Sequence, residues 1–128
     1  MELQFYKCNL CGNLLIPVVS AGVTPVCCGE TMQALAAGAT DASLEKHVPV
    51  IVREDDGKHI GIHIGSAPHP MTEEHLIQVV VLVYENRIYT FKLAPGGEPK
   101  ARCAIKDNQV PVTVYAYCNL HGLWKTEL

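Results

Sequence analysis

Hydrophobic and polar residues alternate with a period of two in several short stretches of the chain, as is typical of β-strands. Ile60, Ile62 and Ile64 alternate with histidine and glycine neighbours. Residues 77–83 form an apolar run, interrupted only by Gln78, that is long enough for a buried strand. The remaining stretches expected to form strands are residues 48–52, 87–93 and 110–115.

Short turn signals separate these stretches. Glu85-Asn86 follows the apolar run, and Ala94-Pro95-Gly96-Gly97 follows the next stretch. No window has a strong helical period, and a weak one occurs at residues 30–37. Many short strands with Pro, Gly and Asn between them predict an all-β chain whose larger part is an antiparallel β-sandwich.

Cysteine and histidine are distributed unevenly along the 128 residues. The first 35 residues hold four of the six cysteines and no histidine, whereas all six histidines lie from residue 47 onward. Residues 36–43 are small and polar, as linkers are. We therefore expect a metal-bound module at residues 1–36, a linker at residues 37–46 and a sandwich domain at residues 47–128.

Composition restricts the classes of function. A net charge of −3 gives no general attraction for nucleic acid or anionic lipid, so we expect neither as a partner. Met1 to Gln4 show no sign of a secretory signal, and the uncharged stretch 8–29 contains Pro17 and Pro25, which disfavour a membrane span. We therefore expect a reducing compartment, where close cysteine pairs bind metal more often than they form disulfides.

Four cysteines form the first candidate metal site: the Cys-x-x-Cys pair Cys8 and Cys11, and the adjacent pair Cys27 and Cys28. A segment of this length buries too little apolar surface to fold alone, so a stabilising metal is expected. Four thiolates suit either zinc or iron, and their spacing does not choose between the two. Two disulfides are the alternative, which a reducing compartment disfavours.

The sandwich region offers a second set of donors, with four imidazoles and one thiolate: His47, His69, His75, Cys118 and His121. Five donors are one too many for tetrahedral zinc and fit a five-coordinate transition metal with one open position. Blue copper is a rival on a β-sandwich, but no methionine follows His121 to act as its axial ligand. Cys118 and His121 are expected just past the last strand, among the loops at one end of the sandwich.

The other histidines and the sixth cysteine are not expected to bind metal. His59 and His63 lie opposite the isoleucine face of their strand and are expected to point to solvent. Cys103 has no cysteine nearby and is expected to be a small residue in a strand.

At this point the motifs resemble those of the desulfoferrodoxin family. Residues 6–32 resemble its desulforedoxin-like domain, and three later motifs resemble its superoxide reductase domain: Glu45-Lys46-His47-Val48-Pro49, Gly65-Ser66-x-Pro68-His69-Pro70-Met71 and Cys118-Asn119-Leu120-His121-Gly122-x-Trp124-Lys125. The resemblance implies a small four-cysteine metal-bound module followed by an immunoglobulin-like sandwich, in a cytoplasmic homodimer.

The resemblance also implies the metals and the reaction. Ferric iron is expected on the four cysteines, and iron that alternates between ferrous and ferric on the four histidines, with Cys118 as axial thiolate. The implied reaction is the one-electron reduction of superoxide to hydrogen peroxide, with a rubredoxin-like electron donor. Lys46 is expected near the site, and Glu45 is expected to take the sixth position once the iron is oxidised.

Two other functions stay open from the sequence. One is a rubredoxin-like electron carrier in which the four-cysteine site does the work and superoxide is not the physiological substrate. The other is a zinc-stabilised binding module without redox chemistry.

Overall fold

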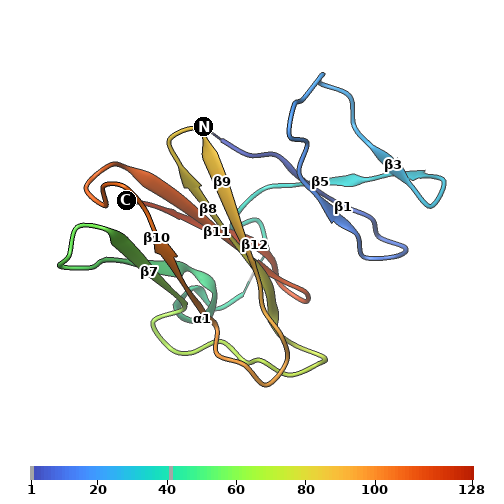
Figure 1. Ribbon diagram of the computed structural model, residues 1–128. Helices are drawn as coiled ribbons and strands as arrows, with labels where there is room; N and C mark the ends of the chain where they lie inside the picture. The colour runs from blue at the N-terminus through green and yellow to red at the C-terminus, as the bar shows by residue number, and fades with distance from the viewer. Residues whose placement is uncertain (1, 41) are drawn as a thin grey trace.

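The computed structural model of the protein describes residues 2–40 and 42–128. Within these ranges the chain forms a small β module and, beside it, a larger β-sandwich (Figure 1). Met1 and residue 41, part of the expected linker, lie outside the described residues. The helix found in the described ranges, α1 (Leu44–His47), has four residues, and none there is long and apolar enough to cross a membrane. The all-β prediction is confirmed.

The N-terminal module contains a three-stranded antiparallel sheet and a separate hairpin. The sheet has the order β2-β1-β5, with β1 at Phe5–Lys7, β2 at Leu14–Leu15 and β5 at Gln33–Leu35. The hairpin pairs β3 (Val26–Cys27) with β4 (Glu30–Thr31). Residues 30–37, the window with a weak helical period, form β4 and β5, because their main chain pairs with β3 and β1.

The second part of the chain is a sandwich of two antiparallel sheets. One sheet has the order β10-β7-β6, with strands at Lys100–Ala104, His59–Ile64 and Pro49–Arg53. The other has the order β12-β11-β8-β9, with strands at Gly122–Glu127, Val112–Cys118, Ile77–Tyr84 and Arg87–Lys92. Ile60, Ile62 and Ile64 of β7 are buried in the core between the sheets, as their alternation predicts.

Both faces of β8 are covered, which explains its continuous apolar run. Val80 and Leu82 belong to the core between the sheets. Val81 and Val83 point to the other face, where they pack with Phe5 of the N-terminal module. The module therefore covers the outer face of the four-stranded sheet and joins the two parts through an apolar contact.

Two features at the C-terminal end differ from the expectations. Cys118 is the last residue of β11 rather than a residue beyond the last strand, and β12 follows it. The sequence hides β12 because Leu123 and Trp124 are both buried, on opposite faces, so a period of two is absent. Cys103 lies buried in β10, which confirms its expected place in a strand.

Candidate metal centres

The four cysteines of the N-terminal module meet in one cluster. One ligand atom from each of Cys8, Cys11, Cys27 and Cys28 lies within 4.8 Å of the other three. The Sγ atoms of Cys11 and Cys27 are 3.6 Å apart and those of Cys27 and Cys28 are 4.0 Å apart, far beyond a disulfide bond. The arrangement fits four thiols around one ion.

The backbone of Cys28 explains how two adjacent cysteines reach the same cluster. Cys28 has a φ of 54° and Gly29 a φ of 76°, both in the left-handed region. In a regular strand, neighbouring side chains point to opposite faces. The left-handed turn after β3 instead brings the Cys28 side chain back toward that of Cys27.

Hydrogen bonds within the cluster shift the pKa values of its thiols in opposite directions. The main-chain N–H of Cys11 donates to Cys8 Sγ at 3.4 Å, and such hydrogen bonds lower the pKa of Cys8 to about 6. Hydrogen bonds among the crowded sulfurs, first from Cys11 and Cys8, raise the pKa of Cys28 to about 12. Four thiolates cannot ionise together without a cation between them, and a bound metal would supply it.

The second cluster is a square of four imidazoles. Ring centroids of neighbouring corners lie 4.7 Å apart for His47–His69 and His69–His75, 5.1 Å for His75–His121 and 4.9 Å for His47–His121. Neighbouring rings are nearly perpendicular, at 74° to 86°, whereas the opposite rings of His47 and His75 are 6.4 Å apart at 29°. The four rings therefore stand like the blades of a propeller around one centre.

Cys118 adds a thiol to this square. His47, His75, Cys118 and His121 offer donor atoms within 4.8 Å of one another. Cys118 is completely buried at the end of β11, and burial raises the pKa of its thiol. The main-chain N–H of His121 donates to Cys118 Sγ at 3.4 Å, which helps to stabilise a thiolate. The sulfur thus approaches the square from the protein interior.

The ring nitrogens of His69 and His75 that make no hydrogen bond are available as metal ligands. His47 Nδ1 and His69 Nδ1 donate to the carbonyl oxygens of Ser43 (2.6 Å) and Pro70 (2.7 Å), so their Nε2 atoms carry the lone pairs. Burial lowers the pKa of His69 to about 4 and also lowers that of His75, which keeps both rings neutral near pH 7. The Nε2 atoms of His69 and His75 are buried without a hydrogen-bond partner. A metal ion would satisfy these orphaned atoms.

The spacing of two ring nitrogens fits a metal as well. His47 Nε2 and His121 Nδ1 are 3.1 Å apart. For neighbouring corners of a square this corresponds to about 2.2 Å from each nitrogen to the centre, close to a usual metal–imidazole bond. The donor set of four imidazoles and one thiol therefore fits a five-coordinate transition metal.

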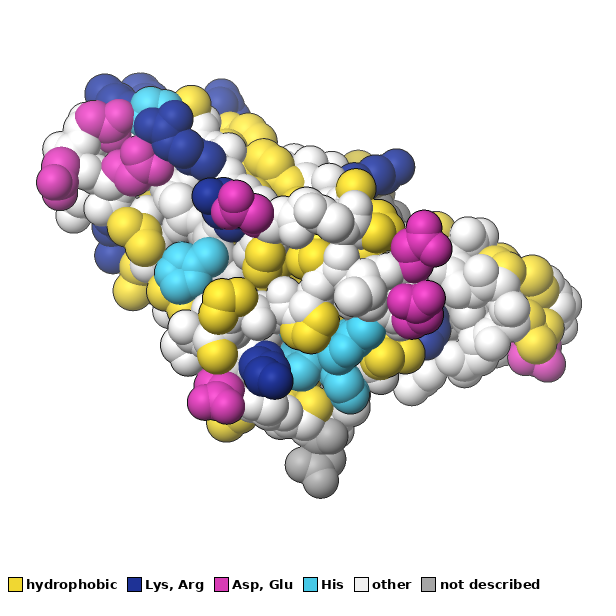
Figure 2. Space-filling view, turned by 90° about the horizontal axis from the view of Figure 1, so that it is seen from below, with side chains coloured by type: hydrophobic (Ala, Val, Ile, Leu, Met, Phe, Trp, Pro, Cys, Tyr) yellow, Lys and Arg dark blue, Asp and Glu magenta, His cyan; other side chains and the backbone are white. Residues whose placement is uncertain are grey.

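Glu45 and Lys46 lie beside this cluster on α1, and both are exposed. The main-chain oxygen of Glu45 accepts a hydrogen bond from Ala67 N–H at 3.0 Å, which fastens α1 to the turn after β7. The positive charge of Lys46 helps to lower the pKa of His75, after burial and the charges of His121 and His47. Figure 2 shows histidine side chains gathered on this end of the molecule, with a basic side chain next to them.

Sequence reasoning missed the role of two residues around the square. Trp124 stacks on His47 and donates from Nε1 to the carbonyl oxygen of His121 at 3.0 Å. Asn119 makes hydrogen bonds to both neighbours of His75 along the chain, Glu74 and Leu76. Their places inside the Cys118–Lys125 motif are the only signal that the sequence carries, since neither is a metal ligand.

The remaining histidines lie elsewhere. His63 is exposed, as expected, whereas His59 is only half-exposed and forms a hydrogen bond with Asp56. Glu54 adds a third possible donor near this pair, but both of its oxygens accept hydrogen bonds from Arg102, at 2.8 and 2.9 Å. Arg102 therefore already neutralises the carboxylate charge that Glu54 would offer to a metal.

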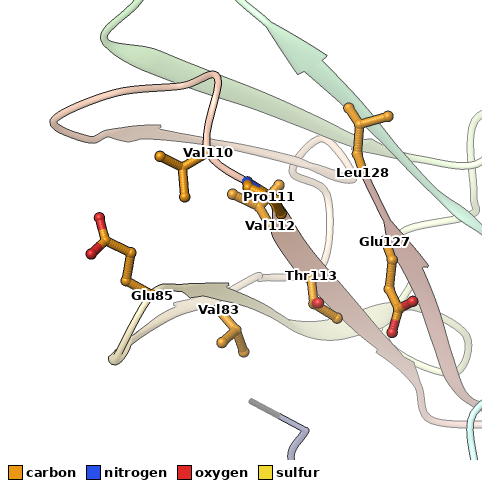
Figure 3. Close-up of a pocket in the computed structure, with 8 residues that line it drawn as sticks. All are labelled: Val83, Glu85, Val110, Pro111, Val112, Thr113, Glu127 and Leu128. Carbon is orange, nitrogen blue, oxygen red and sulfur yellow. The ribbon is translucent and has the colours of Figure 1, made fainter.

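A hollow of about 410 Å³ lies at the other end of β11 from Cys118. Its lining is about equally polar and apolar, and the side chains of Glu85 and Glu127 lie on opposite sides of it (Figure 3). Its described lining residues include no histidine or cysteine, the ligand types of the two clusters above.

Comparison with known proteins finds relatives that match nearly the whole chain. The desulfoferrodoxin family pattern matches residues 39–127, and that of the desulfoferrodoxin N-terminal domain matches residues 1–35. A desulfoferrodoxin of Syntrophotalea carbinolica is 42% identical over 98% of this chain and 97% of its own. A desulfoferrodoxin homolog of Archaeoglobus fulgidus is 42% identical over 97% of this chain and 96% of its own.

A solved structure extends the similarity to three dimensions. The crystal structure of the superoxide reductase from Treponema pallidum has a TM-score of 0.77 and 33% identity, and the match covers 98% of this chain and 99% of that one. The family patterns together cover nearly the whole sequence, and both clusters lie within them. The chain belongs to the desulfoferrodoxin family.

Proposed function

We propose that the protein is a superoxide reductase whose reaction takes place at iron held by His47, His69, His75, His121 and Cys118. The square of four imidazoles with a buried thiol is the observation that carries the proposal. Superoxide takes up one electron and two protons and leaves as hydrogen peroxide. Iron, when bound there, supplies that electron by passing from ferrous to ferric and offers one position for the substrate.

The protein side chains set the conditions for this step. Four imidazoles and one thiolate would give a bound ion five donors, which leaves one position of a six-coordinate ion for the substrate. Cys118 is completely buried, whereas Lys46 lies on the exposed side of α1 beside the cluster. The ammonium group of Lys46 would attract the anionic substrate, and Glu45, matched to the family's glutamate, would be a further ligand for the oxidised iron.

The four-cysteine cluster is proposed to hold ferric iron. Cys11 and Cys28 are exposed, and the neighbouring Leu10 and Val26 are 62% and 67% exposed. This exposure favours electron exchange at the first site and supports a second candidate function, an electron carrier without physiological superoxide activity. For the superoxide reductase we expect a rubredoxin-like donor, a homodimer and a cytoplasmic location, as the family resemblance implies.

Metal content and product stoichiometry test the proposal together. Protein from an iron-replete source should contain two irons per chain. The reduced protein should give one hydrogen peroxide per superoxide consumed and release no dioxygen. Release of dioxygen would show dismutation instead, and unreactive second-site iron beside a redox-active first site would favour the electron carrier. One zinc per chain and no iron would favour a zinc-stabilised module.

A further inference from the structure

Two of the four histidines in the square are fixed through their rings. His47 Nδ1 donates to the Ser43 carbonyl oxygen at 2.6 Å, and His69 Nδ1 donates to the Pro70 carbonyl oxygen at 2.7 Å. Such a hydrogen bond on the outer nitrogen fixes the orientation and the tautomer of a metal-binding histidine. The orientations of the His47 and His69 rings are therefore set by hydrogen bonds of the rings themselves.

His75 is held differently, through its main chain. Its N–H donates to Thr72 Oγ1 at 3.0 Å, and its carbonyl oxygen accepts from Thr72 N at 3.0 Å and from Thr72 Oγ1 at 3.2 Å. The loop containing it is closed by a single bridge between Met71 and Leu76. The position of this ring thus depends on how firmly a short loop is fastened.

The side chain of Asn119 fastens the other side of the loop. Its Nδ2 donates to the Glu74 carbonyl oxygen at 2.9 Å, and its Oδ1 accepts from Leu76 N–H at 3.0 Å. The main-chain N–H of Asn119 also donates to the Leu76 carbonyl oxygen at 3.2 Å. Three hydrogen bonds from one residue therefore enclose His75 on both sides.

Asn119 directly follows Cys118 in the chain. We propose that Asn119 is a positioning residue that fixes His75 relative to the Cys118 thiolate, so that these two donors reach the metal as one rigid unit. The proposal rests on the iron site of the proposed function, but it concerns metal retention and not the reaction.

The primary amide of asparagine suits this task because it both donates and accepts. Aspartate at position 119 could accept from Leu76 N–H, but its carboxylate would face the Glu74 carbonyl oxygen without a donor. Alanine would remove both side-chain hydrogen bonds and leave only the main-chain bond. Asn119→Asp and Asn119→Ala should therefore both loosen the His75 corner.

A double-mutant cycle on iron release tests the proposal. Ferrous protein with both sites filled is mixed with excess chelator, and iron loss from the second site is followed in wild type, Asn119→Ala, His75→Ala and the double variant. Asn119→Ala should speed release about tenfold in the wild-type background, as is usual for a residue that orients a ligand. It should have no further effect once His75 is alanine. Asn86→Ala, in the exposed β8–β9 turn, is the matched control and should release iron as wild type does.

The ferric spectrum gives a second readout that does not need the His75 variant. A moved imidazole changes the ligand field, so the thiolate-to-iron absorption band should shift in Asn119→Ala and Asn119→Asp but not in Asn86→Ala. An equal acceleration of release in both backgrounds, or an unshifted band, would show that Asn119 has a general structural role and would overturn the proposal. Iron release and band position do not depend on superoxide reactivity. A protein that does not react with superoxide, but in which Asn119 and His75 are coupled in iron release, would contradict the proposed function and leave this proposal standing.

Discussion

The indole of Trp124 stacks on the imidazole of His47, with ring centroids 5.0 Å apart and an interplanar angle of 28°. Trp124 is the only tryptophan of the chain and is buried. Its fluorescence can therefore report on the second metal centre.

Binding of iron at the second site should quench Trp124 fluorescence strongly, because the indole stacks on His47, one of the imidazoles that would hold the ion. Titration of metal-free protein with ferrous iron under anaerobic conditions measures this. The quenching should persist in Cys28→Ser and should be lost in a variant with both His69 and His121 changed to alanine. Quenching that survives the loss of both histidines would place the responsible metal elsewhere.

Lys46→Ile should slow the reaction with superoxide by roughly tenfold, within the range of electrostatic steering. The wild-type rate should fall as salt rises, and that of the variant should fall less, because salt screens exposed charges beyond about 10 Å at 0.1 M ionic strength. Stopped-flow or pulse measurements at several salt concentrations give both slopes.

Lys106→Ile is the control for Lys46, since it removes the same charge from an exposed lysine at the other end of β7. The Lys106 carbonyl oxygen accepts from Lys58 Nζ beside the start of β7, whereas α1 packs near the end of that strand. Equal salt slopes in all three proteins would mean that Lys46 is an ordinary surface lysine.

Gly65→Ala should destabilise the protein and disturb the second metal site. Gly65 has a φ of 82°, and a Cβ there would lie 2.7 Å from the Glu45 carbonyl oxygen and 2.8 Å from the carbonyl carbon of Lys46. The added methyl group therefore pushes α1 and His47 away. Gly57→Ala is matched in backbone conformation, with a φ of 71°, but a Cβ there meets nothing within 4 Å.

Gly57→Ala should cost about 1 kcal/mol, from the left-handed conformation alone. Gly65→Ala should cost about 2 kcal/mol more, from the backbone clash. Urea unfolding of the metal-free variants measures both values, and metal analysis should show iron loss from the second site only in Gly65→Ala. Equal losses of unfolding free energy in the two variants would show that α1 moves aside at no energetic cost.

The stability of the metal-free protein should fall as the pH drops from about 7 to about 4. Burial lowers the pKa of His69 from 6.5 to about 4, so in this window the unfolded chain binds a proton that the folded chain does not. By linkage the free energy of unfolding then decreases, by an amount on the order of 2 kcal/mol from this residue. Urea unfolding at several pH values should show a smaller dependence in His69→Gln than in His63→Gln, and equal dependence would contradict the assignment.

Much of the fold followed from residue patterns, and the failures have physical causes. The alternation at Ile60, Ile62 and Ile64 identified β7 because one face is buried and the other is not. β12 was hidden because Leu123 packs toward the N-terminal module while Trp124 packs on His47. A pattern that records hydrophobicity alone cannot distinguish such a strand, which is buried on both faces, from an irregular segment.

The candidate site could be predicted only in part, because some of its features depend on backbone conformation and on contacts between distant residues. Ligand types and their grouping are visible in the sequence, because few other roles require so many cysteines and histidines. The left-handed backbone of Cys28 and the clamp of Asn119 on the His75 loop are long-range or conformational features. They depend on tertiary contacts that no local spacing records.

The central claim is that superoxide reacts at the histidine and cysteine centre and not at the four-cysteine centre. The most direct test is the second-order rate constant for pulse-generated superoxide with reduced protein, measured on wild type and Cys28→Ser with the second iron in place. The account predicts equal rate constants, although Cys28→Ser loses the colour of the first site, and it predicts loss of the reaction in Cys118→Ser. Loss of the reaction in Cys28→Ser with the second iron still bound, or an unchanged rate in iron-loaded Cys118→Ser, would contradict it.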